Sequence, residues 1–161
     1  MTSRITDYVS RPWQTRSMLI SNHFSRKRNI LFKTGVPMFT LALRKKFIAH
    51  HHAASEIDAD HPMRSHLYIL EVMLEAEELD SEGYVLDLDE LEAEVDDILS
   101  QYAYKSLNDA EAFQGRMPTL EAFAQALGDA INESLYAPHL TALSVRLWRD
   151  EKAWALYDIE R

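Results

Sequence analysis

The sequence predicts an α+β domain in which an antiparallel four-stranded sheet carries two helices on one face. Three observations lead to this fold class. Apolar and polar residues alternate in two stretches near the start of the domain, which is the pattern of half-buried strands. Two central stretches then repeat apolar residues at helical spacing. Two more predicted strands follow, so the predicted order is strand–strand–helix–helix–strand–strand.

The first predicted strand begins at Met38 and extends to His51. Lys45 interrupts its otherwise apolar face, which allows a bend or bulge at that position. If the strand reaches His51, this ring lies on the apolar side, and His50 and His52 point away from it. The residues that share the apolar face are Phe39, Leu41, Leu43, Phe47 and His51.

The second predicted strand runs from about His66 to Glu77, after a loop over 53–63. His66 shares the apolar face of this strand with Tyr68. Because two strands flank the loop, histidines from both of them can converge in space. The other apolar residues of that face are Leu70, Val72 and Leu74.

Two amphipathic helices are predicted next. The first begins near Asp89, with Asp87 or Asp89 as its N-cap. The second follows Pro118, with Thr119 as N-cap and Glu121 in the first turn, where a carboxylate favours the positive helix end. Their apolar stripes are Leu88, Leu91, Val95, Ile98, Leu99 and Tyr102 in the first helix, and Leu120, Phe123, Leu127, Ile131 and Leu135 in the second.

The last two strands are predicted around 143–147 and 153–159. A sheet of this kind has two open edges, which predicts pairing with other copies of the chain and hence a homo-oligomer. The chain has 161 residues, no cysteine and no apolar run long enough for a membrane span. We therefore expect a single domain over 38–161 without disulfides, in the cytoplasm and not in a membrane.

Charge divides the chain unevenly. Residues 1–37 carry seven Lys or Arg and one acid, whereas residues 38–161 carry ten Lys or Arg and 25 acids. The acidic part would repel nucleic acid, so we expect no nucleic-acid partner for the folded domain. The basic, serine-rich segment 1–37 is typical of a poorly ordered extension, of a start placed ahead of a natural start at Met38, or of a targeting peptide.

Histidines concentrate in the stretch Phe47–Tyr68. Five of the seven histidines of the chain lie there: His50, His51, His52, His61 and His66. Imidazole is a common zinc ligand, so the stretch indicates a metal-dependent site. The alternative is that these are ordinary surface or core histidines, because a complete zinc site usually has at least three protein ligands.

Six short motifs follow one another along the predicted domain. They are Phe47-Ile-Ala-His-His51, Arg64-Ser-His66-Leu-Tyr68, Gly83-Tyr-Val-Leu-Asp87-Leu-Asp-Glu-Leu91, Leu107-Asn108-Asp109, Pro118-Thr119-Leu-Glu121 and Val145-Arg-Leu-Trp-Arg149. In order and spacing they resemble the motifs of the 6-pyruvoyltetrahydropterin synthase and 6-carboxytetrahydropterin synthase family. The resemblance covers most of 38–157 and implies the tunnelling fold, or T-fold.

The resemblance also implies a function. Members of this family are zinc-dependent lyases that act on a dihydroneopterin triphosphate-like pterin, and one branch serves queuosine biosynthesis. Zinc would act there as a Lewis acid on the substrate side chain. The family assembly is a hexamer of two stacked trimeric rings with active sites at subunit junctions, so the resemblance implies a homo-hexamer here.

The metal ligands of the family are only partly matched. His51 and His66 stand at two of the three ligand positions, but Arg64 stands at the other. Arginine stays protonated and offers no lone pair, so it cannot bind zinc, and His61 or a neighbouring histidine is the expected replacement ligand. The family's cysteine has no counterpart, and Asp60 or His61 is expected to act as the proton shuttle in its place.

The substrate anchor also departs from the family pattern. Arg149 stands where the family has a pterin-binding glutamate, so a hydrogen-bond acceptor is exchanged for a donor. If the strand continues past Arg149, Glu151 shares its face and can replace the glutamate. Ala103 and Tyr104 occupy the positions of an Asp-His pair of the family.

Two functional hypotheses result. The first is a divergent lyase of this family that uses His51, His61 and His66 for zinc. The second is a repurposed or catalytically inactive T-fold oligomer that binds another small molecule. In the second case Arg149 and Arg64 favour an anionic ligand, because guanidinium groups bind such ligands bidentately.

Overall fold

The computed structural model describes residues 37–52 and 63–161 of the chain, which lie within one compact unit, Thr34–Arg161. Its sheet consists of β1 (Phe39–His51), β2 (Arg64–Ala76), β3 (Leu140–Arg149) and β4 (Ala153–Glu160). The strands lie in the order β1-β2-β3-β4, and each adjacent pair is antiparallel. The expectation for a basic extension over 1–37, and those for Asp60 and His61, concern residues outside the described part, apart from Pro37.

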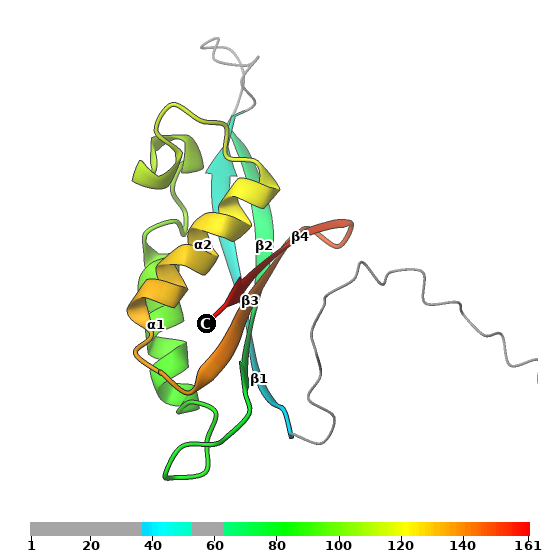
Figure 1. Ribbon diagram of the computed structural model, residues 1–161. Helices are drawn as coiled ribbons and strands as arrows, with labels where there is room; N and C mark the ends of the chain where they lie inside the picture. Colours follow the sequence, from blue (N-terminus) through cyan, green and yellow to red (C-terminus); the bar gives the residue numbers. More distant parts are fainter. Residues whose placement is uncertain (1–36, 53–62) are drawn as a thin grey trace, which may run out of the picture. The chain divides into compact units, whose positions relative to one another are not determined.

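Two helices, α1 (Leu88–Ser100) and α2 (Leu120–Ser134), cover one face of this sheet (Figure 1). This arrangement confirms the predicted α+β fold class. Short 3-10 turns, η2 (Leu107–Asp109) and η3 (Glu111–Phe113), lie in the connection between the helices. None of the helices in the described residues is long and apolar enough to span a membrane.

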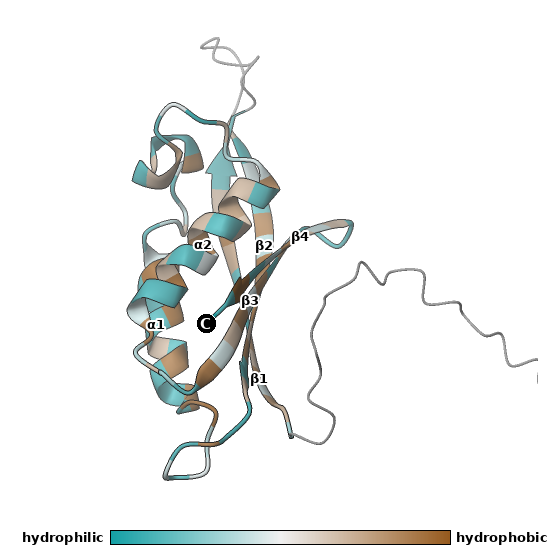
Figure 2. Ribbon diagram, viewed as in Figure 1, coloured by the Kyte–Doolittle hydropathy of each residue, from teal (hydrophilic) through white to brown (hydrophobic). Residues whose placement is uncertain are grey.

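The core lies between the helices and the sheet, and hydrophilic residues lie on the sides of both helices that face away from the sheet (Figure 2). Full burial of a Leu or Ile side chain contributes about 1.5–3 kcal/mol, so the predicted stripes supply much of the stabilisation. The side chains that are fully buried include Leu70, Leu74, Leu91, Leu127, Ile131, Leu143 and Leu147.

Both predicted helix starts are correct. Asp87 is the N-cap of α1, and its carboxylate accepts hydrogen bonds from the backbone N–H groups of Asp89 at 2.8 Å and Glu90 at 3.3 Å. Thr119 is the N-cap of α2 and accepts from Ala122 N at 3.2 Å. These bonds satisfy N–H groups that have no partner within a helix.

Lys45 does not cause a bulge in β1. The register with β2 continues through the pair Lys45–Leu70. The Lys45 ammonium instead reaches α1, where it binds Glu92 and lies 2.9 Å from Asp96 Oδ2. The hydrogen bond that Lys45 donates to Glu92 raises the pKa of Lys45, so the ammonium stays charged. A long side chain can remain on the apolar face because its stem packs while its charge is paired.

The end of β1 is covered by the chain segment that follows α1. Tyr104 N donates to Ile48 O at 2.7 Å, and His50 N donates to Lys105 O at 2.9 Å. A parallel bridge joins His50 to Ser106. These bonds use the edge groups of β1 around residues 48–50, so the edge predicted to be open is occupied over its last part.

Candidate ligand-binding site

His51 and His66 lie side by side on the helix-facing side of the sheet. In the β1–β2 pairing, His51 is opposite Arg64, and Ala49 is opposite His66. Side chains alternate along a strand, so His51, Arg64 and His66 project from one face. The imidazole centroids of His51 and His66 are 4.8 Å apart, with 23° between the ring planes. The alternation in the sequence therefore predicted this pair correctly.

The imidazole of His51 is partly buried and has a free nitrogen. Its Nδ1 is buried without a hydrogen-bond partner in the described residues. Burial lowers the pKa of His51, and the neighbouring His66 and Arg149 lower it further. The ring is therefore neutral at pH 7 and keeps a lone pair. A buried polar atom without a partner costs about 1–3 kcal/mol, which a ligand that bonds to it would recover.

His50 and His52, the neighbours of His51 in the sequence, form hydrogen bonds away from the His51–His66 pair. His50 Nδ1 lies 2.8 Å from Ser65 Oγ, on the opposite face of the sheet. The backbone of His52 is held by Asn108, whose Oδ1 accepts from His52 N at 2.9 Å and whose Nδ2 donates to His52 O at 3.4 Å. Asn108 therefore fixes the end of β1, which carries His51.

A cavity of about 370 Å³ lies beside His51, between the sheet and the start of α2. Two of its walls are chemically distinct: the sheet contributes polar groups, and the helix contributes its N-terminal turn, whose N–H groups carry partial positive charge. Glu121 adds an exposed carboxylate. The lining residues are His51, Tyr68, Met117, Pro118, Thr119, Leu120, Glu121, Arg149 and Ala153.

Tyr68 and Arg149 face this cavity from neighbouring strands, since they are opposite each other in the β2–β3 pairing. Tyr68 is 2% exposed and packs against Phe47 and Phe123. Burial raises the pKa of the Tyr68 hydroxyl, against the effect of Arg149, so the hydroxyl remains a donor. Within the described residues neither the Tyr68 hydroxyl nor the Arg149 guanidinium has a hydrogen bond or an ion pair. The cavity thus presents two unused donors.

Glu151 does not share the face of Arg149. β3 ends at Arg149, and Asp150 has a positive φ of 57° in the turn before β4. Glu151 lines a different hollow with Ile69 and Trp148, which alternate onto the opposite face. The expected placement beside Arg149 is therefore wrong, because the chain turns where the prediction required it to continue. Asp150 is nearer to the site, with Oδ2 3.7 Å from His66 Nδ1.

The described residues alone do not fit a zinc ion. His51 and His66 offer two nitrogen donors, whereas a zinc site usually has at least three protein ligands. In the described ranges no three His, Cys, Asp or Glu side chains are grouped as a metal site requires. Arg64 stands across from His51 and cannot ligate. The predicted third ligand, His61, lies outside the described residues.

Comparison with known protein families shows to which family the chain belongs. The model of the 6-pyruvoyl tetrahydropterin synthase family matches residues 40–160, which is most of the sequence. The chain belongs to this family. The resemblance noted in the sequence motifs is thereby confirmed. No curated protein matches the chain significantly.

Solved structures with the same fold agree. The 6-pyruvoyl tetrahydropterin synthase of Caenorhabditis elegans is 22% identical, with a TM-score of 0.64, and the match covers 78% of this chain and 98% of that one. A catalytic-residue mutant of the Plasmodium vivax enzyme is 13% identical, with a TM-score of 0.64 and coverage of 78% and 99%. An uncharacterized protein from Wolinella succinogenes is 15% identical, with a TM-score of 0.58 and coverage of 77% and 99%. At such identities these likenesses show the T-fold and nothing finer.

Sequence reasoning missed two contributors to the site of this family member. Tyr68 was expected only as a residue of the apolar face, yet it presents a hydroxyl to the cavity. Asn108 belongs to the Leu-Asn-Asp motif, but its partner His52 is 56 residues away in the sequence. The sequence did contain a signal for this role: Asn108 is a polar residue in a predicted loop, and such residues commonly form hydrogen bonds with a nearby backbone.

Proposed function

We propose that this protein binds an anionic small molecule in the cavity beside His51, with Arg149 as the anchor. The observation that carries the proposal is the position of Arg149, at the end of β3, opposite Tyr68 and unpaired within the described residues. A guanidinium binds carboxylate or phosphate through two parallel hydrogen bonds. The family resemblance suggests a pterin-like ring as the rest of the ligand.

The other polar groups of the cavity are also suited to a negatively charged ligand. The Tyr68 hydroxyl and the first N–H groups of α2 are donors or carry partial positive charge. Neutral His51 can donate to the ligand or accept from it through a ring nitrogen. Glu121 is exposed, so its negative charge is screened by solvent. An anion thus meets mostly complementary groups here.

The test compares ligands that differ only in charge. Pterin-6-carboxylate and 6-hydroxymethylpterin form one pair, and neopterin triphosphate and neopterin form another; calorimetry measures each affinity. Because a hydrogen bond to a charged group contributes about 1.5–3 kcal/mol, Arg149→Gln should weaken the anions roughly 10- to 100-fold and leave the neutral partners nearly unchanged. Arg116→Gln is the control, because the exposed Arg116 side chain bonds to Ala112 O and lines a different hollow. Equal affinities for charged and neutral partners in the wild type would refute the proposal.

A second candidate is the zinc-dependent lyase activity of the family on a dihydroneopterin triphosphate-like pterin. The specific observation in its favour is the free, buried Nδ1 of His51 next to the ring of His66. His61 would have to complete the ligand set, with Asp60 or His61 as proton shuttle, and a homo-hexamer would bring neighbouring subunits to the site. These steps remain proposals.

Metal analysis of the purified protein distinguishes the second candidate from the first. Stoichiometric zinc in the wild type that is lost in His51→Ala and His66→Ala, and retained in His139→Ala, would support it. His139 is the matched control because its ring bonds to Val85 O at 2.7 Å, away from the cavity. Zinc-free wild type without turnover of dihydroneopterin triphosphate would eliminate the lyase and leave the anion-binding proposal intact.

A further inference from the structure

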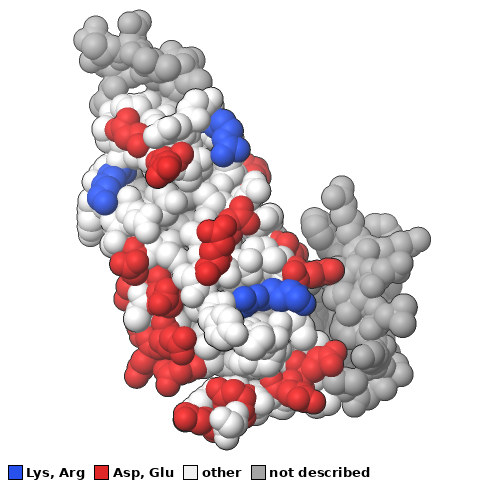
Figure 3. Space-filling view, turned by 60° about the vertical axis from the view of Figure 1, so that its left-hand side comes forward, with Lys and Arg blue, Asp and Glu red and all other residues white. Residues whose placement is uncertain are grey.

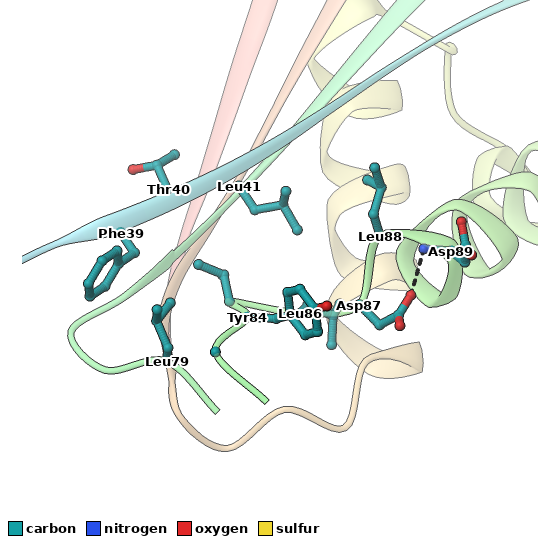
Figure 4. Close-up of a pocket in the computed structure, with 11 residues that line it drawn as sticks. Phe39, Thr40, Leu41, Leu79, Tyr84, Leu86, Asp87, Leu88 and Asp89 are labelled. Carbon is teal, nitrogen blue, oxygen red and sulfur yellow. Dashed lines mark hydrogen bonds between the residues drawn. The ribbon is translucent and has the colours of Figure 1, made fainter. Parts of the chain in front are cut away.

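A second hollow lies at the other end of β1 from His51. It measures about 460 Å³ and is enclosed by the first residues of β1, the segment 79–88 and the first turn of α1. Figure 4 shows Phe39 and Leu79 on one side and Leu88 and Asp89 on the other. β1 has 13 residues, which at about 3.3 Å per residue separates the two ends by roughly 40 Å. We call this hollow the β1–α1 groove; it is distinct from the cavity beside His51.

The β1–α1 groove gathers exposed apolar side chains. Phe39 is 37% exposed, Leu79 37%, Tyr84 51% and Leu88 48%. These four line one hollow although they come from three different segments, and they are a third of the twelve large hydrophobic side chains that are exposed in the described residues. Apolar side chains scattered singly on a surface need no explanation, but a contiguous apolar patch marks an interaction site.

The rim of this groove is acidic. Between Arg64 and Lys105 the chain has 13 Asp or Glu and no Lys or Arg. Figure 3 shows acidic side chains gathered over the part of the molecule where α1 lies, with few basic ones on that face. Glu82, Asp89 and Glu90 lie next to the groove or on its lining, are exposed, and have no ion pair among the described residues. Their charges are therefore available to a partner.

The start of α1 does not offset this negative charge. Its first N–H groups are taken by the carboxylate of Asp87, which caps the helix from within the groove lining. Lys45, the nearest basic residue on the packed face of β1, is bound to Glu92 and Asp96. An acidic peptide or nucleic acid would be repelled.

We propose that the β1–α1 groove docks a basic amphipathic segment of a partner protein. The apolar side chains of that segment fill the hollow between Leu79, Tyr84 and Leu88. Its Lys or Arg side chains lie against Glu82, Asp89 and Glu90. Burial of the apolar residues supplies affinity, while the charge pairs at the rim set orientation and association rate.

The test uses a fluorescent 18-residue synthetic peptide with Leu at helical spacing on one face and Lys on the other. Anisotropy with the full chain measures its affinity. Two companion peptides, one with Glu for Lys and one with Ser for Leu, should bind at least 10-fold more weakly. If the Ser peptide binds as well as the Leu peptide, attraction is charge alone and the proposal fails.

Variants locate the binding. Tyr84→Ser with Leu88→Ser should weaken the peptide at least 10-fold, whereas Tyr136→Ser with Leu156→Ser, on exposed residues outside the groove, should change it less than twofold. A second pair of double variants makes the same comparison by removing charge only. Asp89→Asn with Glu90→Gln removes two carboxylates at the groove, and Asp97→Asn with Glu133→Gln removes two carboxylates elsewhere as the control. Equal losses in the groove and control variants would overturn the proposal. So would self-association of the wild type that Tyr84→Ser with Leu88→Ser abolishes, since it would assign the groove to a second copy.

Discussion

Replacing Asn108 with alanine should loosen the strand end that carries His51. Asn108 bonds to both backbone groups of His52, at 2.9 Å through Oδ1 and at 3.4 Å through Nδ2. The shorter bond contributes about 1 kcal/mol, the longer one little, and the part-buried N–H left behind adds a desolvation cost. We therefore expect Asn108→Ala to lower the free energy of unfolding by about 1–2 kcal/mol and the melting temperature by a few degrees.

Urea unfolding followed by circular dichroism measures that loss, and hydrogen exchange shows where it acts. The amides of His50 and Tyr104 join β1 to the covering segment, so they should exchange faster in Asn108→Ala. Asn108→Asp keeps the Oδ1 acceptor and is the matched control; it should retain most of the protection. An unfolding free energy within 0.5 kcal/mol of wild type, together with unchanged exchange at His50 and Tyr104, would refute this reasoning.

Two further predictions concern packing and pH. Gly128→Ala should destabilise the protein by roughly 1–2 kcal/mol in urea unfolding. The new Cβ would lie 2.6 Å from Tyr157 Cδ1, which is too close for an ordinary contact. The cost of this overpacking, about 1–3 kcal/mol, exceeds the gain of about 1 kcal/mol in helix propensity. An unchanged or raised stability would show that Tyr157 moves freely despite its hydrogen bond to Asp129. The second prediction concerns pH. The pKa of His51 is lower in the folded protein, so the unfolded chain binds a proton at this imidazole more tightly than the folded protein does. Neutral His51 therefore adds its full contribution to the free energy of unfolding above about pH 6.5, and this contribution is lost as the pH falls below that value. With a chelator present, the rise in unfolding free energy from pH 5.5 to 7.5 should be smaller in His51→Gln, and an identical rise in both proteins would contradict this assignment.

The sequence predicted the scaffold well because local patterns determine it. Period-two alternation placed β1, β2 and β3, and helical spacing placed α1 and α2. The caps were recognisable since Asp87 and Thr119 act within three residues of their own position. The placement of His51 on the face of the sheet opposite to His50 followed from alternation alone. Each of these features depends on neighbours in the chain.

The errors and omissions depend on partners that are distant in sequence. Lys45 looked like a fault in the strand because its partners, Glu92 and Asp96, lie on a helix about 50 residues later. Glu151 was placed beside Arg149 by extending a strand that ends at Arg149, and nothing in the alternation marked that turn. Asn108 acts through the backbone of His52, which no periodicity reports.

Two of the positions where this chain differs from the family motifs lie where the fold tolerates change. Arg64 is the first residue of β2 and Arg149 the last of β3, and both are exposed. Exposed strand ends contribute little packing, so substitutions there alter chemistry at small cost in stability. The groups that hold the site, such as Ala49, Tyr68 and Asn108, are instead buried or bonded. The fold can therefore persist while residues at exposed strand ends are exchanged, which is why membership of this family identifies the scaffold and not the ligand.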